Sequence, residues 1–171
     1  MPKTSPEQAA SALLQEFRIE RTPVAVADIA KKRGVKVSVG PLPVDISGFL
    51  IREKGSAIIA VNSLHSSTRQ RFTIAHELGH LEMGHPAKSD VYRGLNFRNE
   101  KSSQGDDELE IEANRFAASL LMPEGRILEL VGSKGVDLED EQRIQSLAKK
   151  FEVSPQALIF RLINLRLATQ H

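Results

Sequence analysis

The chain opens with hydrophobic positions at helical spacing. Ser5 stands three residues before Gln8 and directly before a proline, which is the pattern of a capping box, so a helix is expected over residues 6–18. A second, shorter helix is expected to open at Thr22-Pro23 and to close at Gly34.

The hydrophobic pattern then changes to alternation and short apolar runs, which indicates strands. Lys36 lies between two valines, as in a half-buried strand. Residues 46–52 and 57–61 flank a turn, 53–56, that contains a glycine, which is typical of a β-hairpin. A small antiparallel sheet is therefore expected.

Helical spacing returns after the hairpin. Ser67 and Gln70 form a second capping-box pattern, and the helix that they open is expected to run to about Met83 and to stop at Gly84-His85-Pro86. Residues 86–107 are polar and irregular, and a loop of this length is usually a lid or a mobile segment.

Helices are predicted through the rest of the chain, over 106–121, 123–131, 140–150 and 155–168. Helices followed by strands and then by helices, without βαβ alternation, predict an α+β fold.

Composition narrows the classes of function. The 171 residues are 40% hydrophobic and 26% charged, as in a globular domain. A net charge of +1 argues against a broad nucleic-acid or membrane partner. There is no cysteine, so any metal must be held by histidines and carboxylates. No secretory signal or membrane-spanning run is visible, and a cytoplasmic location is expected.

One motif carries metal chemistry. His76 and His80 are four residues apart, so on a helix both imidazoles lie on one face and can hold one ion. Zinc held by two histidines and a carboxylate keeps one position for a water whose pKa falls to about 7. Glu77 is expected to be the catalytic base that takes a proton from this water and passes it to the leaving amine.

The alternative is a surface helix with two solvated histidines. The neighbours of the motif are apolar nearly all round the helix, which favours a buried helix whose histidines need partners: Phe72, Ile74, Ala75, Leu78 and Leu81. Gly79 costs helix stability, and we interpret it as the place where a second helix approaches closely.

The third ligand is expected from the helix at 106–121. Its candidates are Glu108, Glu110 and Glu112. Glu110 lies about 60° from the centre of the apolar face and is the best aimed of the three, given about 100° per residue. An acidic first turn that suits the helix dipole is the alternative, and it explains the other two glutamates better.

Three further residues are candidates to support the metal ligands or the reacting group. Asn114 lies one turn after Glu110 and can accept the outer N–H of a ligating histidine. His85 is one position short of the metzincin spacing, so we expect it to support the site or an oxyanion rather than to bind metal. Tyr92, in the loop, can donate to a tetrahedral intermediate, although an ordinary half-buried loop tyrosine is the simpler interpretation.

Two segments resemble the signatures of the ImmA/IrrE family of metallopeptidases. They are residues 71–80, which contain the histidine motif, and residues 110–123, which contain Glu110, Asn114 and a terminal Met-Pro. The resemblance implies a small zincin-like (mini-gluzincin) domain, with N-terminal helices, the small antiparallel sheet, the active-site helix and C-terminal helices.

The resemblance also implies the chemistry. It places the metal ligands at His76, His80 and Glu110 and the base at Glu77, and Asn114 departs from the aspartate that related zincins often carry. Zinc is expected, with Mn²⁺ and Fe²⁺ as alternatives that such a site also accepts. Family members are cytoplasmic, and many cleave a helix-turn-helix repressor and so regulate transcription in a stress response.

The C-terminal segment allows two interpretations. Residues 144–158 resemble a helix-turn-helix, but the last helix is too apolar to read a DNA groove freely. We therefore predict a zincin-like domain at 1–132 and, at 133–171, a helical pair that packs on it without direct DNA binding.

Three functions are weighed. The first is a zinc endopeptidase whose extended substrate adds a strand to the 57–61 edge. The second is a non-catalytic regulator that binds a repressor or toxin, against which the intact Glu77 argues. The third is a DNA-binding protein, which the near-neutral charge disfavours.

Overall fold

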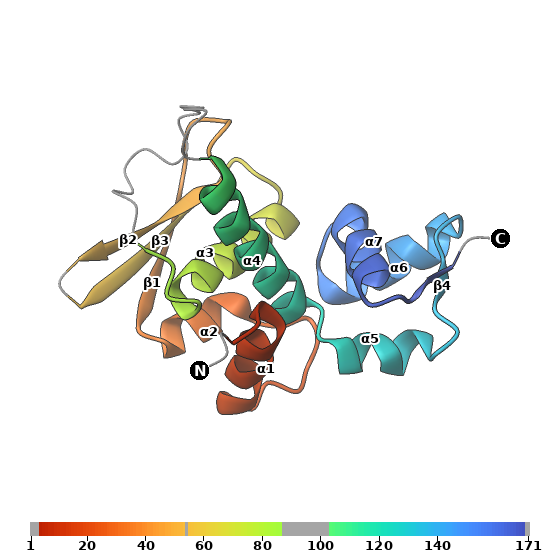
Figure 1. Ribbon diagram of the computed structural model, residues 1–171. Coiled ribbons are helices and arrows are strands. Elements are labelled where there is room, and N and C mark those ends of the chain that lie inside the picture. The colour runs from red at the N-terminus through yellow and green to blue at the C-terminus, as the bar shows by residue number, and fades with distance from the viewer. Residues whose placement is uncertain (1–3, 54, 87–102, 170–171) are drawn as a thin grey trace.

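The computed structural model describes residues 4–53, 55–86 and 103–169. In Figure 1 a sheet and the helices α1–α4 make up one side of the molecule, and α5–α7 make up the other. The described part is an α+β fold, as the sequence predicts. Within it, no helix is long and apolar enough to cross a membrane.

The N-terminal helices are α1 (Pro6–Glu16) and α2 (Val26–Lys32). The capping box of α1 is confirmed, because Ser5 and Gln8 exchange side-chain and backbone hydrogen bonds. The predicted start of the second helix is wrong. The helix begins at Val26, and the Val24 carbonyl accepts hydrogen bonds from the Val26 amide and from the side chain of Arg71, so residues 22–24 precede the helix.

The sheet contains β1 (Val35–Gly40), β2 (Gly48–Glu53) and β3 (Ser56–Asn62), in the order β1-β3-β2. The predicted hairpin is confirmed, since β2 and β3 are antiparallel. The sheet is mixed rather than wholly antiparallel, because β3 inserts between the other two strands and runs parallel to β1.

The central place of β3 changes the substrate pose. Ala57 to Val61 are hydrogen-bonded to a strand on either side, so strand addition at this segment is wrong. Among the described strands, β2 has a partner on one side only.

Asn62, which is fully buried, holds the connection that leads into β2. Its amide nitrogen donates to the carbonyl of Ile46 (2.8 Å), and its amide oxygen accepts from the backbone of Leu42 (3.1 Å). A single buried amide therefore fixes where β2 begins.

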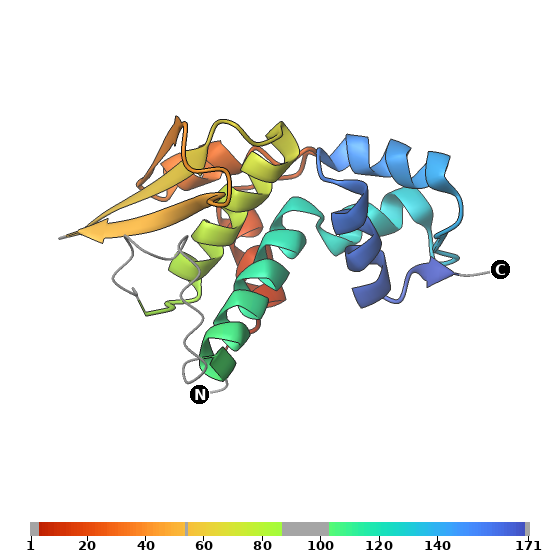
Figure 2. The ribbon, with the colours of Figure 1, turned by 90° about the horizontal axis from the view of Figure 1, so that it is seen from above.

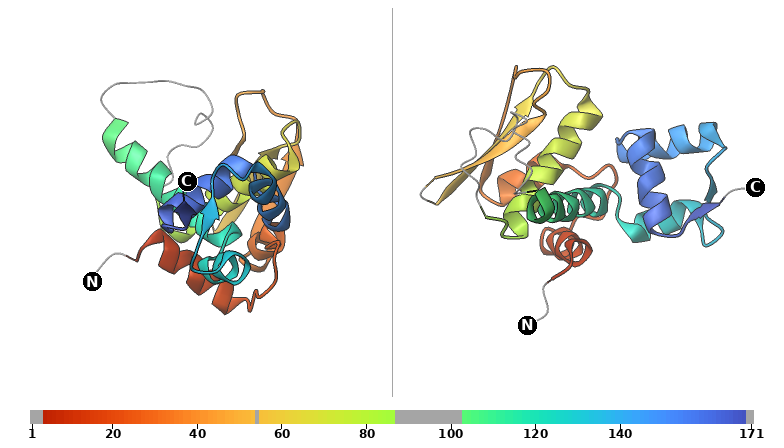
Figure 3. Two further views of the ribbon diagram at one scale, coloured as in Figure 1. Left: turned by 90° about the vertical axis from the view of Figure 1, so that its right-hand side faces the viewer. Right: turned by 45° about the horizontal axis from the view of Figure 1, so that its top comes forward.

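Two long helices form the centre of the molecule, α3 (Ser67–Glu82) and α4 (Ser103–Leu121). Figure 3 shows α3 between the sheet and α4, with α1 on the far side of α4. The predicted cap at Ser67 is wrong by one residue: Ser66 is the N-cap, and Gln70 bonds instead to the His65 carbonyl.

Gly79 confirms the expected close approach of a second helix, which is α4. A Cβ atom there would lie 3.0 Å from the ring of Phe116 and 3.2 Å from the carbonyl oxygen of Ala113. The faces in contact are fully buried on the α4 side, so the two helices are held at a fixed distance and rotation.

The C-terminal elements are α5 (Glu124–Val131), β4 (Val136–Asp137), α6 (Glu141–Phe151), α7 (Pro155–Asn164) and β5 (Ala168–Thr169). Figure 2 shows them beside the end of α4. The helix predicted to reach residue 168 ends at Asn164, and a short parallel β4–β5 pair follows. The buried Arg161 donates to the Met122 carbonyl (3.1 Å) and so ties α7 to the end of α4.

Candidate metal centre

The helix α3 presents the histidine motif as its spacing predicts. His76 and His80 lie one turn apart, and their Nε2 atoms are 3.1 Å from each other. His80 is 3% exposed and the His76 side chain 16%, so both rings are held by packing.

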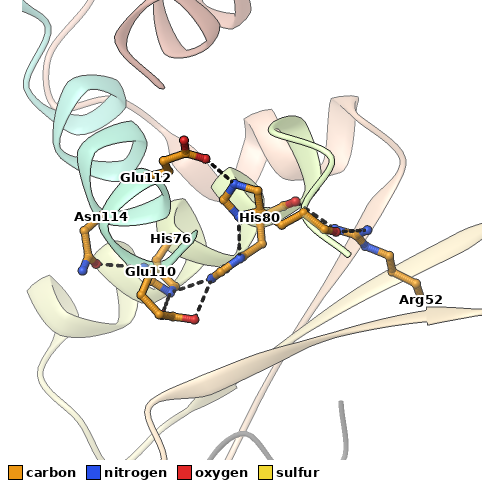
Figure 4. Close-up of polar contacts among 7 residues, drawn as sticks. Arg52, His76, His80, Glu110, Glu112 and Asn114 are labelled. Carbon is orange, nitrogen blue, oxygen red and sulfur yellow. Dashed lines mark hydrogen bonds and ion pairs between the residues drawn. The ribbon is translucent and has the colours of Figure 1, made fainter. Parts of the chain in front are cut away.

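The helix α4 brings a carboxylate to the same point. Glu110 Oε2 lies 3.1 Å from His76 Nε2, and Glu110 Oε1 lies 3.4 Å from His80 Nε2. Figure 4 shows the three side chains converging. Ligand atoms around a tetrahedral zinc with bonds of 2.0–2.1 Å are spaced by about 3.3 Å, so this triangle of donors fits a metal of that size.

Asn114 sets the orientation of the first histidine. Its Oδ1 lies 2.9 Å from His76 Nδ1, and an amide oxygen can only accept a hydrogen bond. The Nδ1 atom of His76 therefore carries the proton in the neutral ring. Its Nε2 lone pair is left to face the centre of the triangle.

The second histidine is oriented by a longer chain of contacts. His80 Nδ1 lies 2.9 Å from His85 Nδ1, and His85 Nε2 lies 3.0 Å from Glu112 Oε2. The carboxylate accepts from His85 Nε2, so in a neutral His85 ring Nδ1 is the acceptor. His80 Nδ1 must then donate, and its Nε2 also faces the triangle with a lone pair.

Arg52 of β2 fixes the end of α3. Its guanidinium donates to the carbonyl oxygens of His80 (2.9 Å) and His85 (3.0 Å). Figure 4 shows this side chain reaching the same turn from the sheet. The segment that carries His85 is thereby held against the helix that carries the donors.

The charges of the centre are strongly coupled. Hydrogen bonds from His76 and His80 hold the pKa of Glu110 well below its usual range, against the opposing effect of burial. Burial lowers the pKa of His76, but its bond to Glu110 and the charge of Glu77 outweigh burial and raise the pKa. The negative environment that stabilises a proton here also favours a metal cation.

A cavity of about 340 Å³ opens at the triangle. Glu77 lines it beside the three donors, and Ser47 and Gly48 line it from the start of β2. This placement is suitable for a base that acts on a water or substrate in the cavity.

The structure brings together most of the residues singled out from the sequence. His76, His80, Glu110 and Asn114 meet at one point, and His85 stands behind His80 with both ring nitrogens in contact with protein groups. Glu108 is exposed. Tyr92 and most of the predicted lid, 87–102, lie outside the described residues.

Two contributors were missed in the sequence. Glu112, a candidate third ligand whose alternative is an acidic residue favoured by the helix dipole, instead contacts His85, and the signal for this contact is that a buried histidine needs a partner. Arg52 gave no signal, because its bonds are to backbone carbonyls far along the chain.

In zincin-like folds, a helix that carries two histidines one turn apart packs on a second helix that supplies a carboxylate. The helices α3 and α4 have this arrangement. Residues 30–163 match the Peptidase M78 family, whose description is "IrrE N-terminal-like domain". The chain belongs to this family.

Two similar proteins are consistent with membership of this family. The chain is 33% identical over 107 residues to the radiation response metalloprotease IrrE of Deinococcus radiodurans, which covers 61% of this chain and 30% of that protein. It is 34% identical over 80 residues to the uncharacterized immunity region protein 2 of Bacillus phage phi105, 47% of each. The chain thus spans less than half the length of these relatives.

One solved structure, a Mycobacterium tuberculosis transcriptional regulator, shares the fold. The TM-score is 0.64 at 19% identity, over 92% of this chain and 46% of that one.

Proposed function

We propose that this protein is a zinc-dependent endopeptidase that cleaves a partner protein. The observation that carries the proposal is the triangle of His76, His80 and Glu110 atoms at 3.1–3.4 Å, with Glu77 on the wall of the same cavity. A purely structural metal site has no use for a carboxylate placed beside it in an open cavity.

The residues of the metal centre have two proposed roles, metal binding and proton transfer. His76, His80 and Glu110 would hold the metal, which when bound supplies Lewis acidity and an acidified water. Glu77 accepts a proton within the cavity and returns it to the leaving amine nitrogen. Water can reach this carboxylate because Glu77 is only half-buried and lines the cavity.

Hydrogen bonds from neighbouring side chains orient the rings of both proposed histidine ligands. Asn114 holds the ring of His76, and the His85–Glu112 pair holds the ring of His80. Partners of this kind fix the tautomer and increase the basicity of a ligating histidine. We propose His85 as such a support rather than as an oxyanion donor, because its ring nitrogens face His80 and Glu112.

The substrate is proposed to lie extended along β2. This strand is an edge of the sheet within the described residues, and its first residues line the cavity. An added strand satisfies the backbone groups of the substrate and draws the peptide past the donors.

A transcriptional repressor with a helix-turn-helix is the proposed partner. Membership of the family supports this, as do a relative named for a radiation response and another for a phage immunity region. The non-catalytic regulator remains the second candidate function, because a metal-bound fold can also bind a repressor without cleaving it.

Metal content tests the site directly. Purified protein supplied with zinc should hold about one zinc per chain by mass spectrometry, and His76→Ala and Glu110→Gln should lose it. Glu108→Gln is the matched control, since this exposed glutamate of the same helix should leave zinc content unchanged. Retention of zinc in Glu110→Gln, or absence of metal in the unaltered protein, would contradict the proposed ligands.

Glu77→Gln separates catalysis from binding. The variant should retain zinc and the fold but should not cleave a co-expressed helix-turn-helix repressor, whereas the unaltered protein should cleave it in a chelator-sensitive manner. Equal regulatory effect from both proteins in cells would support the non-catalytic regulator instead.

A further inference from the structure

A second, larger hollow of about 650 Å³ adjoins the metal cavity. It lies between the start of α3, the middle of α4 and the helix α7, elements whose arrangement can be followed in Figure 2. Arg69, Phe72 and Asn114 line both hollows, so the larger one, here the α4–α7 groove, continues directly from the metal centre.

The walls of the α4–α7 groove include large apolar side chains that are exposed to solvent. Ile111 of α4 is 55% exposed and Phe160 of α7 is 58% exposed, and both line the groove together with the half-buried Phe72. Large side chains left in solvent beside a functional cavity indicate a surface that an apolar group covers.

The charged side chains that line the groove within the described residues are all positive. Arg69, Arg115 and Arg161 are among its lining residues, and no aspartate or glutamate lines it within the part of the chain that the structure describes. Arg115 is paired with Glu7 at 2.9 Å, and Arg161 is buried and bonded to a backbone carbonyl. These two arginines are therefore engaged within the fold.

Arg69 differs from them. Its guanidinium donates to the hydroxyl of Ser47, from Nη2 at 2.8 Å and from Nε at 3.1 Å, and within the described residues no ion pair to it is found. Its side chain is exposed on the border between the groove and the metal cavity. A cation in this position has capacity for an incoming carboxylate.

We propose that the α4–α7 groove binds a segment of the substrate protein next to the bond to be cleaved. A large apolar side chain of that segment occupies the space between Ile111 and Phe160, and an adjacent acidic side chain binds Arg69. The inference rests on the proposed peptidase function, and it assigns the substrate an apolar residue beside an acidic one near the scissile bond.

A polypeptide fits this groove better than DNA does. Its most exposed large side chains are aliphatic and aromatic, and among the described residues Arg69 is the one exposed arginine of the lining without an ion pair, whereas phosphate backbones are bound by several cations at once. The volume is also that of a pocket for a few side chains rather than of a groove-reading surface.

The test is a titration of full-length Glu77→Gln protein with isotope-labelled isoleucine methyl groups. The probe is the peptide acetyl-Gly-Glu-Phe-Gly-amide, and the reporters are Ile111 in the groove and Ile163, which is exposed on the same helix as Phe160 but outside the lining. The Ile111 methyl signal should shift saturably, and that of Ile163 should not.

Two altered peptides and four variants define specificity. Lysine in place of the probe's glutamate, or alanine in place of its phenylalanine, should weaken binding by about fivefold or more. Arg69→Gln and Phe160→Ala should do the same, while the controls Arg126→Gln and Ile163→Ala should not.

Three results would overturn the proposal. The first is the absence of a saturable Ile111 shift up to about 10 mM peptide, and the second is equal binding of the lysine peptide. The third is an Ile111 shift that a short DNA duplex produces at a lower concentration than the peptide does. Because methyl shifts report binding without cleavage, a positive titration stands even if the protein proves not to be a peptidase. A negative titration in a protein that holds zinc and cleaves a repressor would reject the groove alone.

Discussion

His80 and His85 face each other through their Nδ1 atoms at 2.9 Å, and the far nitrogen of His85 lies 3.0 Å from Glu112. Two like nitrogens can share a hydrogen bond only if one of them carries the proton. The Glu112 carboxylate behind His85 decides which one. It thereby sets the tautomer of His80, a proposed metal ligand, through the intervening ring of His85.

Loss of this support should weaken metal binding without removing it. His85→Ala and Glu112→Gln are each expected to raise the dissociation constant for zinc by about 10–100-fold, the usual effect of removing a partner of a ligating histidine. Competition with a chromophoric chelator measures this constant. His85→Gln, whose side-chain oxygen can still accept from His80, should recover part of the loss, and equal affinity in all variants would show that His85 only packs.

Arg52→Ala should destabilise the end of α3. The change removes the arginine donor to the carbonyl oxygen of His85, and it removes one of two donors to the carbonyl oxygen of His80, which also accepts from the His85 backbone N–H. An unsatisfied buried group costs about 1–3 kcal/mol. Urea unfolding should show this loss, while Arg126→Ala, which breaks an exposed ion pair within α5, should change stability by about 0.5 kcal/mol or less. A similar effect of both substitutions would contradict the role of Arg52.

The stabilisation of the fold by zinc should increase as the pH rises. Despite burial, the pKa of His76 is raised above its ordinary 6.5 by Glu110, and hydrogen bonds from the histidines lower that of Glu110 below its ordinary 4.5. In the metal-free protein, His76 therefore contributes stability below pH 6.5 that is lost as the pH rises through its raised pKa. Glu110 contributes stability above pH 4.5 that is lost as the pH falls through its lowered pKa.

Zinc must displace the proton on His76, so zinc binds weakly below the raised pKa of His76 and more tightly above that pKa. The increase in Tm on adding zinc should be small at about pH 5.5 and larger at about pH 7.5. Asn114→Asp offers a contrast, because a carboxylate behind His76 should hold the proton to higher pH and shift the profile upward. An equal increase in Tm at both pH values would contradict proton competition.

Gly48→Ala should disturb the junction of β2 with α3. A Cβ atom at this position would overlap the carbonyl oxygen of Ala60 and the methyl group of Thr73, and overpacking of this kind typically costs about 1–3 kcal/mol. Gly40→Ala is the matched control, since it also lies in a strand and has nothing within 4 Å of the added atom. Thermal unfolding of the two variants should differ clearly, and equal Tm values would refute the overlap.

Features that depend on neighbours in the chain were predicted from the sequence. The Ser5–Gln8 capping box, the hairpin around Gly55 and the common face of His76 and His80 all follow from local periodicity and turn chemistry. Gly79 was also interpreted correctly, because a glycine between two histidines on an otherwise apolar helix has few causes other than close packing. The expected zincin-like fold and family followed from the two motifs.

Features that depend on how distant segments meet were decided by the tertiary structure. The insertion of β3 between β1 and β2 makes these two strands the edges of the sheet, and no pattern within a strand reveals which neighbour it will pair with. The contact of Glu112 with His85, and the position of Arg69 between two hollows, likewise require the packing of α3 against α4 and α7. The sequence by itself determined the helix that presents two histidines, because helical geometry repeats every few residues. The same geometry and the family resemblance favoured Glu110 as the carboxylate that meets them. Only the packed structure decided that Glu112 contacts His85 and how close Glu110 comes to the histidines, because that depends on the distance and rotation at which two helices, far apart in the chain, bury their apolar faces.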